Sequence, residues 1–312
     1  VVLVPDERVD KLAELSKSKK KIYAIVNFVD IAGLVKGASA GEGLGNKFLS
    51  HIREVDAVLY VLRAFKKSDI VNTQQEVNPI REKEILDVEL ILKDLDTLNK
   101  RIDGLAGDVR QNKKEAVKEM SALKKAKEFL SQEKVLIEQE FTEDEKEILK
   151  GFQLLTYKPR LYLLNGKDEE VDKNILETFN KNNWQYLIID VATEYDAEGL
   201  SKEERQGLDL PMDSETDILV KKSYKLLDLI TFLTTGEDET RAWTIKNGDT
   251  APKAGSAIHT DFENKFVKAE VVFWKDLMDL GGYAKARELG KLRTEGKEYV
   301  VKDGDVIEFK HG

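Results

Sequence analysis

Four short apolar runs, rich in β-branched residues, recur along the first two thirds of the chain. They occupy residues 22–29, 57–62, 161–164 and 186–191. Continuous apolar runs of this length are typical of parallel strands that helices cover on both faces. We therefore predict an α/β fold with a doubly wound, mostly parallel sheet.

A helical period fills the interval between the second and third runs. Apolar residues recur three and four positions apart in residues 85–105, and a more charged stretch follows. Asp103-Gly-Leu-Ala-Gly107 predicts a break between two helices, and Thr142-Glu-Asp-Glu145 has the spacing of a capping box that starts a further helix. Residues 85–140 are therefore predicted to form an antiparallel, coiled-coil helical hairpin. Its second helix is expected to present one apolar face, made of Val117, Met120, Leu123 and Leu130.

The chain changes character again at about Leu229. Short strand-like runs at residues 241–245 and 268–273 precede a longer one at 299–309, where Asp303-Gly304 predicts a hairpin turn. Residues 229–312 are therefore predicted to form a small α+β domain of their own. The remaining segments, 1–84 and 141–228, are assigned to the domain with the parallel sheet.

Composition narrows the function. The 312 residues include no cysteine and three histidines, which excludes disulfides and cysteine nucleophiles and argues against zinc. The net charge of -9 argues against a wholly basic nucleic-acid binder, but local patches remain available for RNA. The sequence has no membrane-spanning apolar run and no signal peptide, so we expect a cytoplasmic protein without a membrane partner.

A nucleotide-hydrolase motif follows the first predicted strand. Asp30-Ile-Ala-Gly33 places a carboxylate where it can hold Mg²⁺ through water and a glycine N–H where it can approach a γ-phosphate. A plain turn at the end of the strand is the alternative reading of this tetrapeptide. The glycine-rich stretch at residues 33–45 favours the first reading, because a segment that rearranges around a phosphate needs backbone freedom.

Two further motifs follow predicted strands. Asn165-Gly-Lys-Asp168 comes after the third strand and Ala192-Thr-Glu194 after the fourth, where side chains or backbone N–H groups can contact a nucleotide base. Each motif alone is more often a turn, but their order after Asp30 and Gly33 favours a base site. The candidate base contacts are Asn165, Gly166, Lys167, Asp168, Ala192 and Thr193.

Together these segments resemble a known family. The chain reads Phe28-Val-Asp-Ile-Ala-Gly-Leu-Val-Lys-Gly-Ala-Ser-Ala-Gly-Glu-Gly-Leu-Gly-Asn-Lys-Phe-Leu49 and then Ile52-Arg-Glu-Val-Asp-Ala57, which resembles the signature of the YchF/Obg-like ATPases. Residues 241–245, 250–254 and 258–263 resemble the C-terminal TGS domain of that family, a β-grasp module. The resemblance implies a P-loop G domain interrupted by a coiled coil, with residues 229–312 as the TGS domain. It also implies a monomeric, Mg²⁺-dependent ATP or GTP hydrolase that binds ribosomes and regulates translation.

Two features depart from the pattern of the family, the missing P-loop and Asp168, whereas Leu34 follows the family and differs from Ras-like enzymes. No Gly-x-x-x-x-Gly-Lys-Ser/Thr motif occurs, so we expect the P-loop to precede Val1 and the chain as given to be inactive without it. Leu34 stands where other enzymes carry a water-orienting glutamine, which leaves the general base unassigned. Asp168 stands where the family usually has glutamate. We expect ATP to be preferred over GTP, with a translation-factor GTPase or a non-catalytic ribosome- or RNA-binding module as alternatives.

Other charged and histidine residues have a structural and a functional interpretation. His259 either fixes a turn of the C-terminal domain or contacts RNA, whereas His51 and His311 are interpreted as a helix residue and a tail residue. The hairpin lysines form either a solvated face or an arm that binds a partner. These lysines are Lys113, Lys114, Lys118, Lys124, Lys125 and Lys127.

Overall fold

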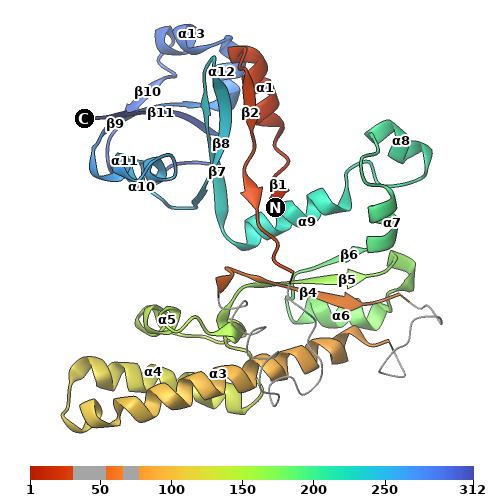
Figure 1. Cartoon of the computed structure of the whole chain (residues 1–312), viewed down its shortest axis with the longest axis vertical. Helices are drawn as coiled ribbons and strands as arrows, with labels where there is room; N and C mark the ends of the chain where they lie inside the picture. The colour runs from red at the N-terminus through yellow and green to blue at the C-terminus, as the bar shows by residue number, and fades with distance from the viewer. Residues whose placement is uncertain (31–53, 66–76) are drawn as a thin grey trace. The chain divides into compact units, whose positions relative to one another are not determined.

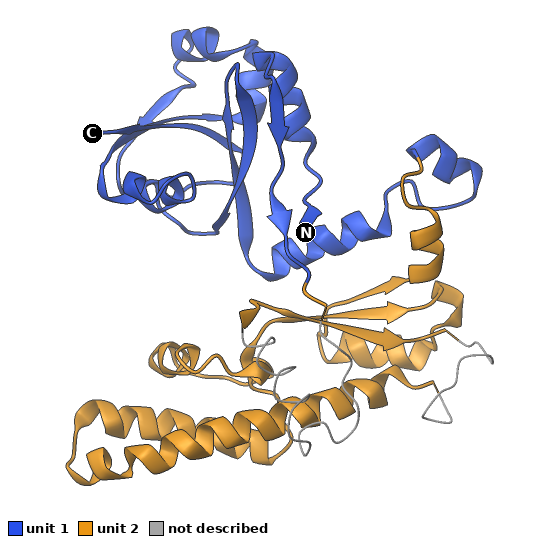
Figure 2. Cartoon of the chain, in the orientation of Figure 1, with its two compact units in different colours: residues 1–28, 201–312 blue, residues 29–200 orange. Residues whose placement is uncertain are grey.

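The computed structural model describes residues 1–30, 54–65 and 77–312, which form two compact units (Figures 1 and 2). Unit 1 comprises Val1–Phe28 and Ser201–Gly312, and unit 2 comprises Val29–Leu200. These units are not the predicted domains, because residues 1–28 and 201–228 pack with the C-terminal segment. The predicted hairpin 85–140 lies within unit 2.

Unit 2 is built on a parallel sheet. Its three strands, in the order β4-β5-β6, are β4 (Val58–Arg63), β5 (Arg160–Asn165) and β6 (Tyr186–Ile189). Buried apolar side chains such as Leu62, Tyr162 and Leu164 form its core with Phe179 of α6. Parallel strands joined by helices confirm the predicted α/β fold. The helical elements that connect and follow the strands are η3 (Leu155–Tyr157), η4 (Asp168–Glu170), α6 (Lys173–Lys181) and α7 (Val191–Asp196).

The first predicted strand is not part of this sheet. Residues 22–29 instead contribute to β2 (Lys20–Ile22), which runs parallel to β8 (Glu239–Lys246), and to β3 (Ile25–Val26), which is antiparallel to β1 (Val2–Leu3). Burial alternates here: Val26 is buried, whereas Ile25 is 48% exposed. Alternation of this kind belongs to strands covered on one face only, so the apolar run was wrongly interpreted as covered on both faces.

The predicted helical hairpin is present, but its turn lies elsewhere. Helices α3 (Pro79–Arg110) and α4 (Lys114–Ser131) lie side by side (Figure 1), and Asn112 turns the chain with a positive φ of 57°. The break predicted at residues 103–107 is wrong, because α3 continues through Gly104 and Gly107. A Cβ atom at either glycine would meet nothing within 4 Å, so both sit on the open side of the helix.

The hairpin core is the expected apolar seam. Leu98 and Leu105 of α3 pack against Leu123 and Leu130 of α4, whereas Val117, expected on the same face, is 43% exposed. The capping box is confirmed, since the Glu145 N–H donates to Thr142 Oγ1 and the Thr142 N–H donates to Glu145 Oε2. The elements that follow α4 are η2 (Leu136–Glu138) and α5 (Glu143–Lys150).

Two buried carboxylates join α3 to the sheet. Asp94 is fully buried and accepts hydrogen bonds from the N–H groups of Leu155 and Thr156, at 2.9 and 2.8 Å, and from the Thr156 hydroxyl. Asp87 lies two helical turns earlier and accepts from Arg160, from Lys83 and from the Tyr60 hydroxyl, at 2.6 to 2.8 Å. The base of the hairpin is therefore fixed to the start of β5.

Unit 1 is a six-stranded sheet with helices. The strand order is β10-β9-β11-β7-β8-β2, in which the central pair β11 and β7 is parallel. Its remaining elements are α1 (Glu7–Ser16), α8 (Lys202–Gly207), α9 (Glu215–Leu226), β7 (Leu229–Thr235), α10 (Ala251–Ser256), α11 (Asp261–Asn264), β9 (Phe266–Phe273), α12 (Trp274–Leu280), α13 (Tyr283–Glu288), β10 (Arg293–Glu295) and β11 (Asp305–His311).

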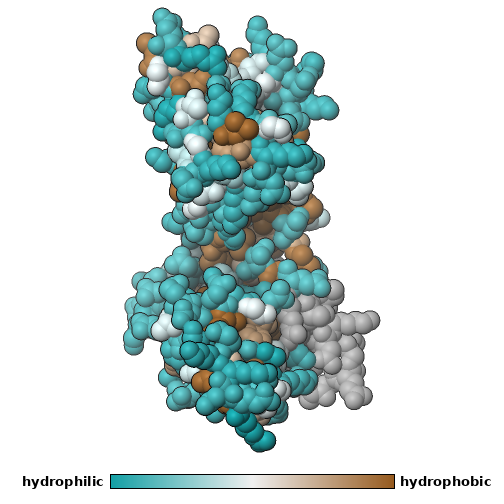
Figure 3. Space-filling view, turned by 90° about the vertical axis from the view of Figure 1, so that its left-hand side faces the viewer, coloured by the Kyte–Doolittle hydropathy of each residue, from teal (hydrophilic) through white to brown (hydrophobic). Residues whose placement is uncertain are grey.

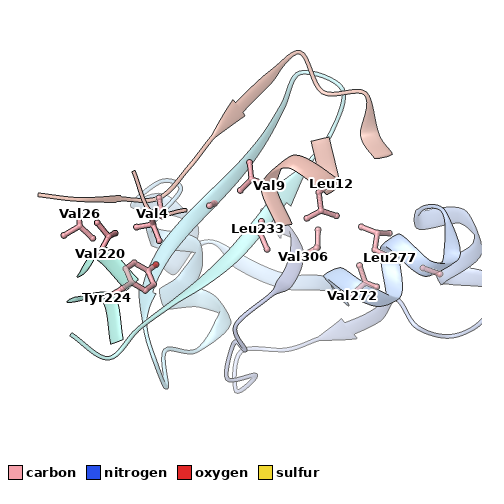
Figure 4. Close-up of a cluster of buried hydrophobic side chains, with 13 residues drawn as sticks. Val4, Val9, Leu12, Val26, Val220, Tyr224, Leu233, Val272, Leu277 and Val306 are labelled. Atoms are coloured by element: carbon pink, nitrogen blue, oxygen red, sulfur yellow. The ribbon is translucent and has the colours of Figure 1, made fainter. Parts of the chain in front are cut away.

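Helix α1 supplies part of the core of unit 1. Figure 4 shows Val9 and Leu12 of this helix beside Leu233, Val272 and Val306 of the central strands. Both α1 side chains are fully buried. The last 84 residues therefore share their core with the first helix of the chain.

The turn at Asp303-Gly304 is not a hairpin turn. It leads into β11, whose antiparallel partner is β9, and so the predicted hairpin is wrong. Asp303 instead accepts from the Thr231 N–H and from Arg8. Gly304 has a φ of 86°, and a Cβ there would lie 2.7 Å from Trp274 Cδ1. The Asp-Gly pair therefore serves a tight tertiary contact rather than strand reversal.

One face of the molecule is largely polar. The face in Figure 3 is mostly hydrophilic, with scattered hydrophobic side chains. Within the described residues, no helix combines the length and the apolar character needed to cross a membrane.

Candidate functional site

Three strand ends meet at one edge of the unit 2 sheet. Arg63, the last residue of β4, is in register with Asn165 of β5, and Asn165 is in register with Ile189 of β6. The residues that follow each strand therefore emerge side by side. This carboxyl edge is where open parallel sheets bind ligands.

Asn165 is fixed by hydrogen bonds on two sides. Its backbone carbonyl accepts from the N–H groups of Ala64 and Phe65, at 2.8 and 3.0 Å. Its side-chain Oδ1 accepts from the Val191 N–H at 3.2 Å. Because that N–H can only donate, the amide must turn its oxygen toward Val191. Among the described residues, none accepts a hydrogen bond from Nδ2, which can therefore donate to another molecule.

Gly166 lies where only glycine fits. Its N–H donates to the Ile189 carbonyl at 3.0 Å, which ties β5 to β6. An added Cβ would lie 2.9 Å from the Phe65 nitrogen and 3.1 Å from the Ala64 carbonyl carbon. Both of these are backbone atoms that a rotamer change cannot move. Close approach of two chain segments thus explains the glycine.

Lys167 and Asp168 project into solvent. Both are exposed, and the Lys167 N–H donates to Glu170 Oε2 at 3.2 Å, which shapes the turn of η4. The Asp168 carboxylate accepts no hydrogen bond from any residue that the structure describes. It therefore stays hydrated at the rim of the strand edge.

Ala192 and Thr193 belong to the first turn of α7. The Asp190 carboxylate accepts from the Thr193 hydroxyl at 2.6 Å and from the Thr193 N–H at 3.3 Å. The hydroxyl bond, together with the N–H groups of Thr193 and Ala192 and the charge of Lys167, lowers the pKa of Asp190. These N–H groups are thus directed to their own cap, and their assignment as base contacts stays a prediction.

Three residues at this edge were not predicted from the sequence. The Arg63 guanidinium lies 4.8 Å from the centre of the Phe65 ring, and the Arg63 N–H donates to Glu82 Oε2 at 3.0 Å. Burial raises the pKa of Glu82, with the Arg63 N–H and charge opposing that effect. The sequence could have indicated Arg63 and Phe65 only by their position, since they come just after the predicted strand 57–62. Glu82 had no such indication.

The Asp-x-x-Gly motif is described only in part. Asp30 is exposed at the end of the first described segment, whereas Gly33, Leu34 and His51 lie outside the described residues. Across residues 1–30, 54–65 and 77–312, no group of three or more histidine, cysteine or acidic side chains is placed to hold a metal ion. The assignment of Mg²⁺ to Asp30 stays a prediction.

His259 has a structural contact in unit 1. Its Nδ1 accepts from the Asp261 N–H at 3.2 Å, just before α11. This bond fits the turn-fixing interpretation of His259. His311 lies in β11 and packs on Phe262 with ring centres 4.5 Å apart, so it is a strand residue and not part of a free tail.

Comparison with known proteins gives one consistent result. The family of YchF-type GTPase C-terminal domains, described as proteins of unknown function, matches residues 229–312, and the family described as 50S ribosome-binding GTPase matches residues 8–94. The chain is 44% identical to the ribosome-binding ATPase YchF of Bacillus subtilis, with 99% of this chain and 88% of that protein covered. It is 39% identical to Obg-like ATPase 1 of Oryza sativa, with 99% of this chain and 81% of that protein covered.

A solved structure agrees with these sequence matches. The structure of the Schizosaccharomyces pombe YchF GTPase matches with a TM-score of 0.86 and 35% identity, over 99% of this chain and 86% of that one.

The close approach at Gly166 generates a testable prediction. Gly166→Ala should lower the free energy of unfolding by about 1–3 kcal/mol, because the new methyl group overlaps backbone atoms. Gly104→Ala is the matched control, since it adds the same methyl group in open space on α3 and should raise stability by about 0.5–1 kcal/mol. Urea unfolding of both variants measures the difference. Equal effects of the two substitutions would contradict the tight contact.

Proposed function

Because the chain belongs to the YchF/Obg-like ATPase family, we propose that it is a Mg²⁺-dependent nucleotide hydrolase, with ATP preferred over GTP, that acts on ribosomes. The observation that carries this proposal is the register of Arg63, Asn165 and Ile189 at one sheet edge, beside the Asn165 amide, which donates to no residue in the described part of the chain. We further propose a cytoplasmic, monomeric protein that couples nucleotide turnover to translation.

The strand edge offers contacts that suit a purine. The Asn165 amide group can donate to N7, an acceptor that adenine and guanine share, so this contact fixes the base without choosing between them. The Phe65 ring, held against the Arg63 guanidinium, offers an apolar surface beside Gly166. Lys167 and the first turn of α7 complete the surroundings of the proposed base site.

Asp168 permits adenine because its carboxylate remains in water. Guanine presents two adjacent donors, which a carboxylate in the base plane can accept, whereas adenine presents an acceptor at N1. A buried carboxylate facing that acceptor would cost about 1–3 kcal/mol. The exposed Asp168 avoids this penalty, because it keeps its hydration when adenine binds. ATP is therefore compatible with the departure from the usual glutamate.

Asp30 is proposed to support the metal. An exposed carboxylate after a strand suits Mg²⁺, which prefers oxygen ligands and keeps part of its water shell. When bound, Mg²⁺ neutralises charge that develops on the phosphates. Gly33 is proposed to donate its N–H to the γ-phosphate. Leu34 cannot orient water with its side chain, so slow turnover is expected.

The hairpin is proposed to contribute to ribosome binding together with the C-terminal segment. Two of its lysines are neutralised locally, Lys113 by Asp108 and Lys125 by Glu145. Within the described part of the chain, Lys114, Lys118 and Lys124 are exposed and have no carboxylate partner. Free ammonium groups along one helix can meet RNA phosphates even though the whole chain is acidic.

Hydrolysis by the full-length protein that carries the P-loop tests the enzymatic proposal. Asp30→Ala should reduce turnover of Mg-ATP by about 10–100-fold, because the support of the metal is removed. Asp103→Ala, which removes an exposed carboxylate from α3, is the control and should leave turnover unchanged. A full-length protein that binds ribosomes without hydrolysing nucleotide would instead support a non-catalytic binding module.

Binding constants for ATP and GTP test the choice of base. The unmodified protein should bind ATP more tightly than GTP, and Asp168→Glu should preserve that order because both carboxylates reach solvent. Isothermal titration with non-hydrolysable analogues gives both constants. GTP binding at least tenfold tighter than ATP binding would favour a GTPase of the translation-factor class.

Co-sedimentation with ribosomes over a salt series tests the hairpin. Replacing Lys114, Lys118 and Lys124 with glutamine should weaken ribosome binding. The plot of log binding constant against log salt concentration should also become shallower, by on the order of one unit of slope for each phosphate that the variant no longer neutralises. The control replaces Lys173, Lys181 and Lys221, which removes the same charge elsewhere. Equal weakening in the two triple variants would indicate a general charge effect rather than a hairpin contact.

A further inference from the structure

The central strands of unit 1 separate at their carboxyl ends. The parallel ladder between β7 and β11 comprises one register pair, Leu233 opposite Val306. Beyond that pair, Thr234 and Thr235 of β7 pair only with β8, and Ile307 to Phe309 of β11 pair only with β9. These residues line a cavity of about 460 Å³. A cavity of this size accommodates a small organic ligand.

The cavity has an apolar end and a polar end. Alternation along β11 places Ile307 and Phe309 on one face of the sheet, with the Phe232 core, and Glu308 on the other. The apolar end also includes Ile258 and Phe262, and the polar end includes Tyr283 and Arg287 from α13. A ligand that fills this cavity must therefore combine a flat apolar part with charged or hydroxyl groups.

The polar end provides both donors and an acceptor. One guanidinium nitrogen of Arg287 donates to Glu270 at 3.1 Å. The Arg287 side chain is 66% exposed, so its other N–H groups can donate to a ligand. The Tyr283 hydroxyl makes no hydrogen bond to another described residue. Glu308 forms an ion pair with Lys310 but keeps further acceptor positions on its carboxylate. Arginine and tyrosine suit a phosphate, and a carboxylate suits ribose hydroxyls.

The apolar end suits a nucleobase. Phe262 packs on His311 with ring centres 4.5 Å apart and on Phe309 at 6.4 Å, which forms an aromatic wall. Aromatic side chains stack with any base, because every base has a π face. We propose that the gap between the ends of β7 and β11 binds a single ribonucleotide, with the base at Phe262 and Phe309, the ribose at Glu308 and the phosphate at Arg287. This site is separate from the proposed hydrolase site, since its lining residues all belong to unit 1.

The ribonucleotide has two possible sources, a free mononucleotide or a nucleotide in single-stranded RNA. Fluorescence anisotropy of a 5′-labelled A₆ RNA hexamer, with the intact protein, measures the RNA arm. Competition of that probe by AMP measures the free-nucleotide arm. If AMP displaces the labelled probe at a lower concentration than unlabelled A₆ hexamer does, the cavity is a mononucleotide site. If only the unlabelled hexamer displaces the probe, the cavity is an RNA site. Either result supports the proposal.

Conservative variants test the assigned contacts. Arg287→Gln should weaken hexamer binding at least fivefold, and Tyr283→Phe about twofold to fivefold. Lys285→Gln, on the same helix but outside the lining, is the matched control and should change binding less than twofold. Wild-type protein should prefer the RNA hexamer over its DNA counterpart, and Glu308→Gln should reduce that preference because the ribose hydroxyl contact weakens.

Several outcomes would overturn the proposal. Equal weakening by Arg287→Gln and Lys285→Gln would reduce the binding to general charge attraction. Displacement of the probe by L-phenylalanine but not by AMP would assign the cavity to an amino acid. Absence of hexamer and AMP binding would leave no nucleotide site in unit 1. Thermal unfolding verifies that each variant is folded, and ATP turnover of the same full-length preparations reports separately on the hydrolase site.

Discussion

Helix α3 buries the carboxylates of Asp87 and Asp94, and the arrangement of unit 2 depends on how these two charges are neutralised. A charge taken out of water costs several kcal/mol unless donors surround it. Asp94 receives three hydrogen bonds from Leu155 and Thr156, and Asp87 receives three from Tyr60, Lys83 and Arg160. Since each set of donors comes partly from the segment that enters β5, the helix and the strand can take only one relative position.

Strand β5 connects these buried carboxylates to the candidate site. Arg160 begins the strand and is held by Asp87, whereas Asn165 ends it and directs its amide oxygen to Val191. Helix α3 reaches the same edge at its own N-terminus, where Glu82 accepts the Arg63 N–H. One helix thus connects the edge proposed for nucleotide with the hairpin proposed for the ribosome. The contacts of Glu82 with β4 and of Asp87 with β5 therefore attach the same helix to the sheet at two points.

Local patterns in the sequence predicted local structure, and tertiary contacts decided the rest. The capping box at Thr142 is confirmed because both of its partners lie within four residues. The break at residues 103–107 is wrong because glycine in a helix costs only about 1 kcal/mol, which the packing of Leu98 and Leu105 offsets. The hairpin at Asp303 is wrong because the carboxylate bonds to Thr231 and Arg8, which are distant in sequence.

In the candidate site, too, local sequence patterns predicted some features and tertiary contacts decided the others. The apolar run before Asn165 predicted a strand end, and the structure places Asn165 at the carboxyl edge of the parallel sheet. The assignment of that edge to a nucleotide base stays a prediction. Phe65 and Glu82 had no motif, because their role comes from contacts across the edge rather than from spacing along the chain. The roles of Gly33 and Asp168 stay predictions, since they depend on a nucleotide and not on the fold.

The two ends of the chain form one folded unit, which constrains how unit 2 is connected. Val9 and Leu12 of α1 are buried against Leu233 and Val306, and Arg8 bonds to Asp303, 295 residues away. Residues 1–28 and 201–312 therefore share one core, while residues 29–200 form a unit between them in sequence. Closing so long a loop is costly in entropy, and that cost is lower if unit 2 is already compact when the loop closes. The hydrogen bonds of Asp87 and Asp94, whose donors lie within unit 2, allow that order of events.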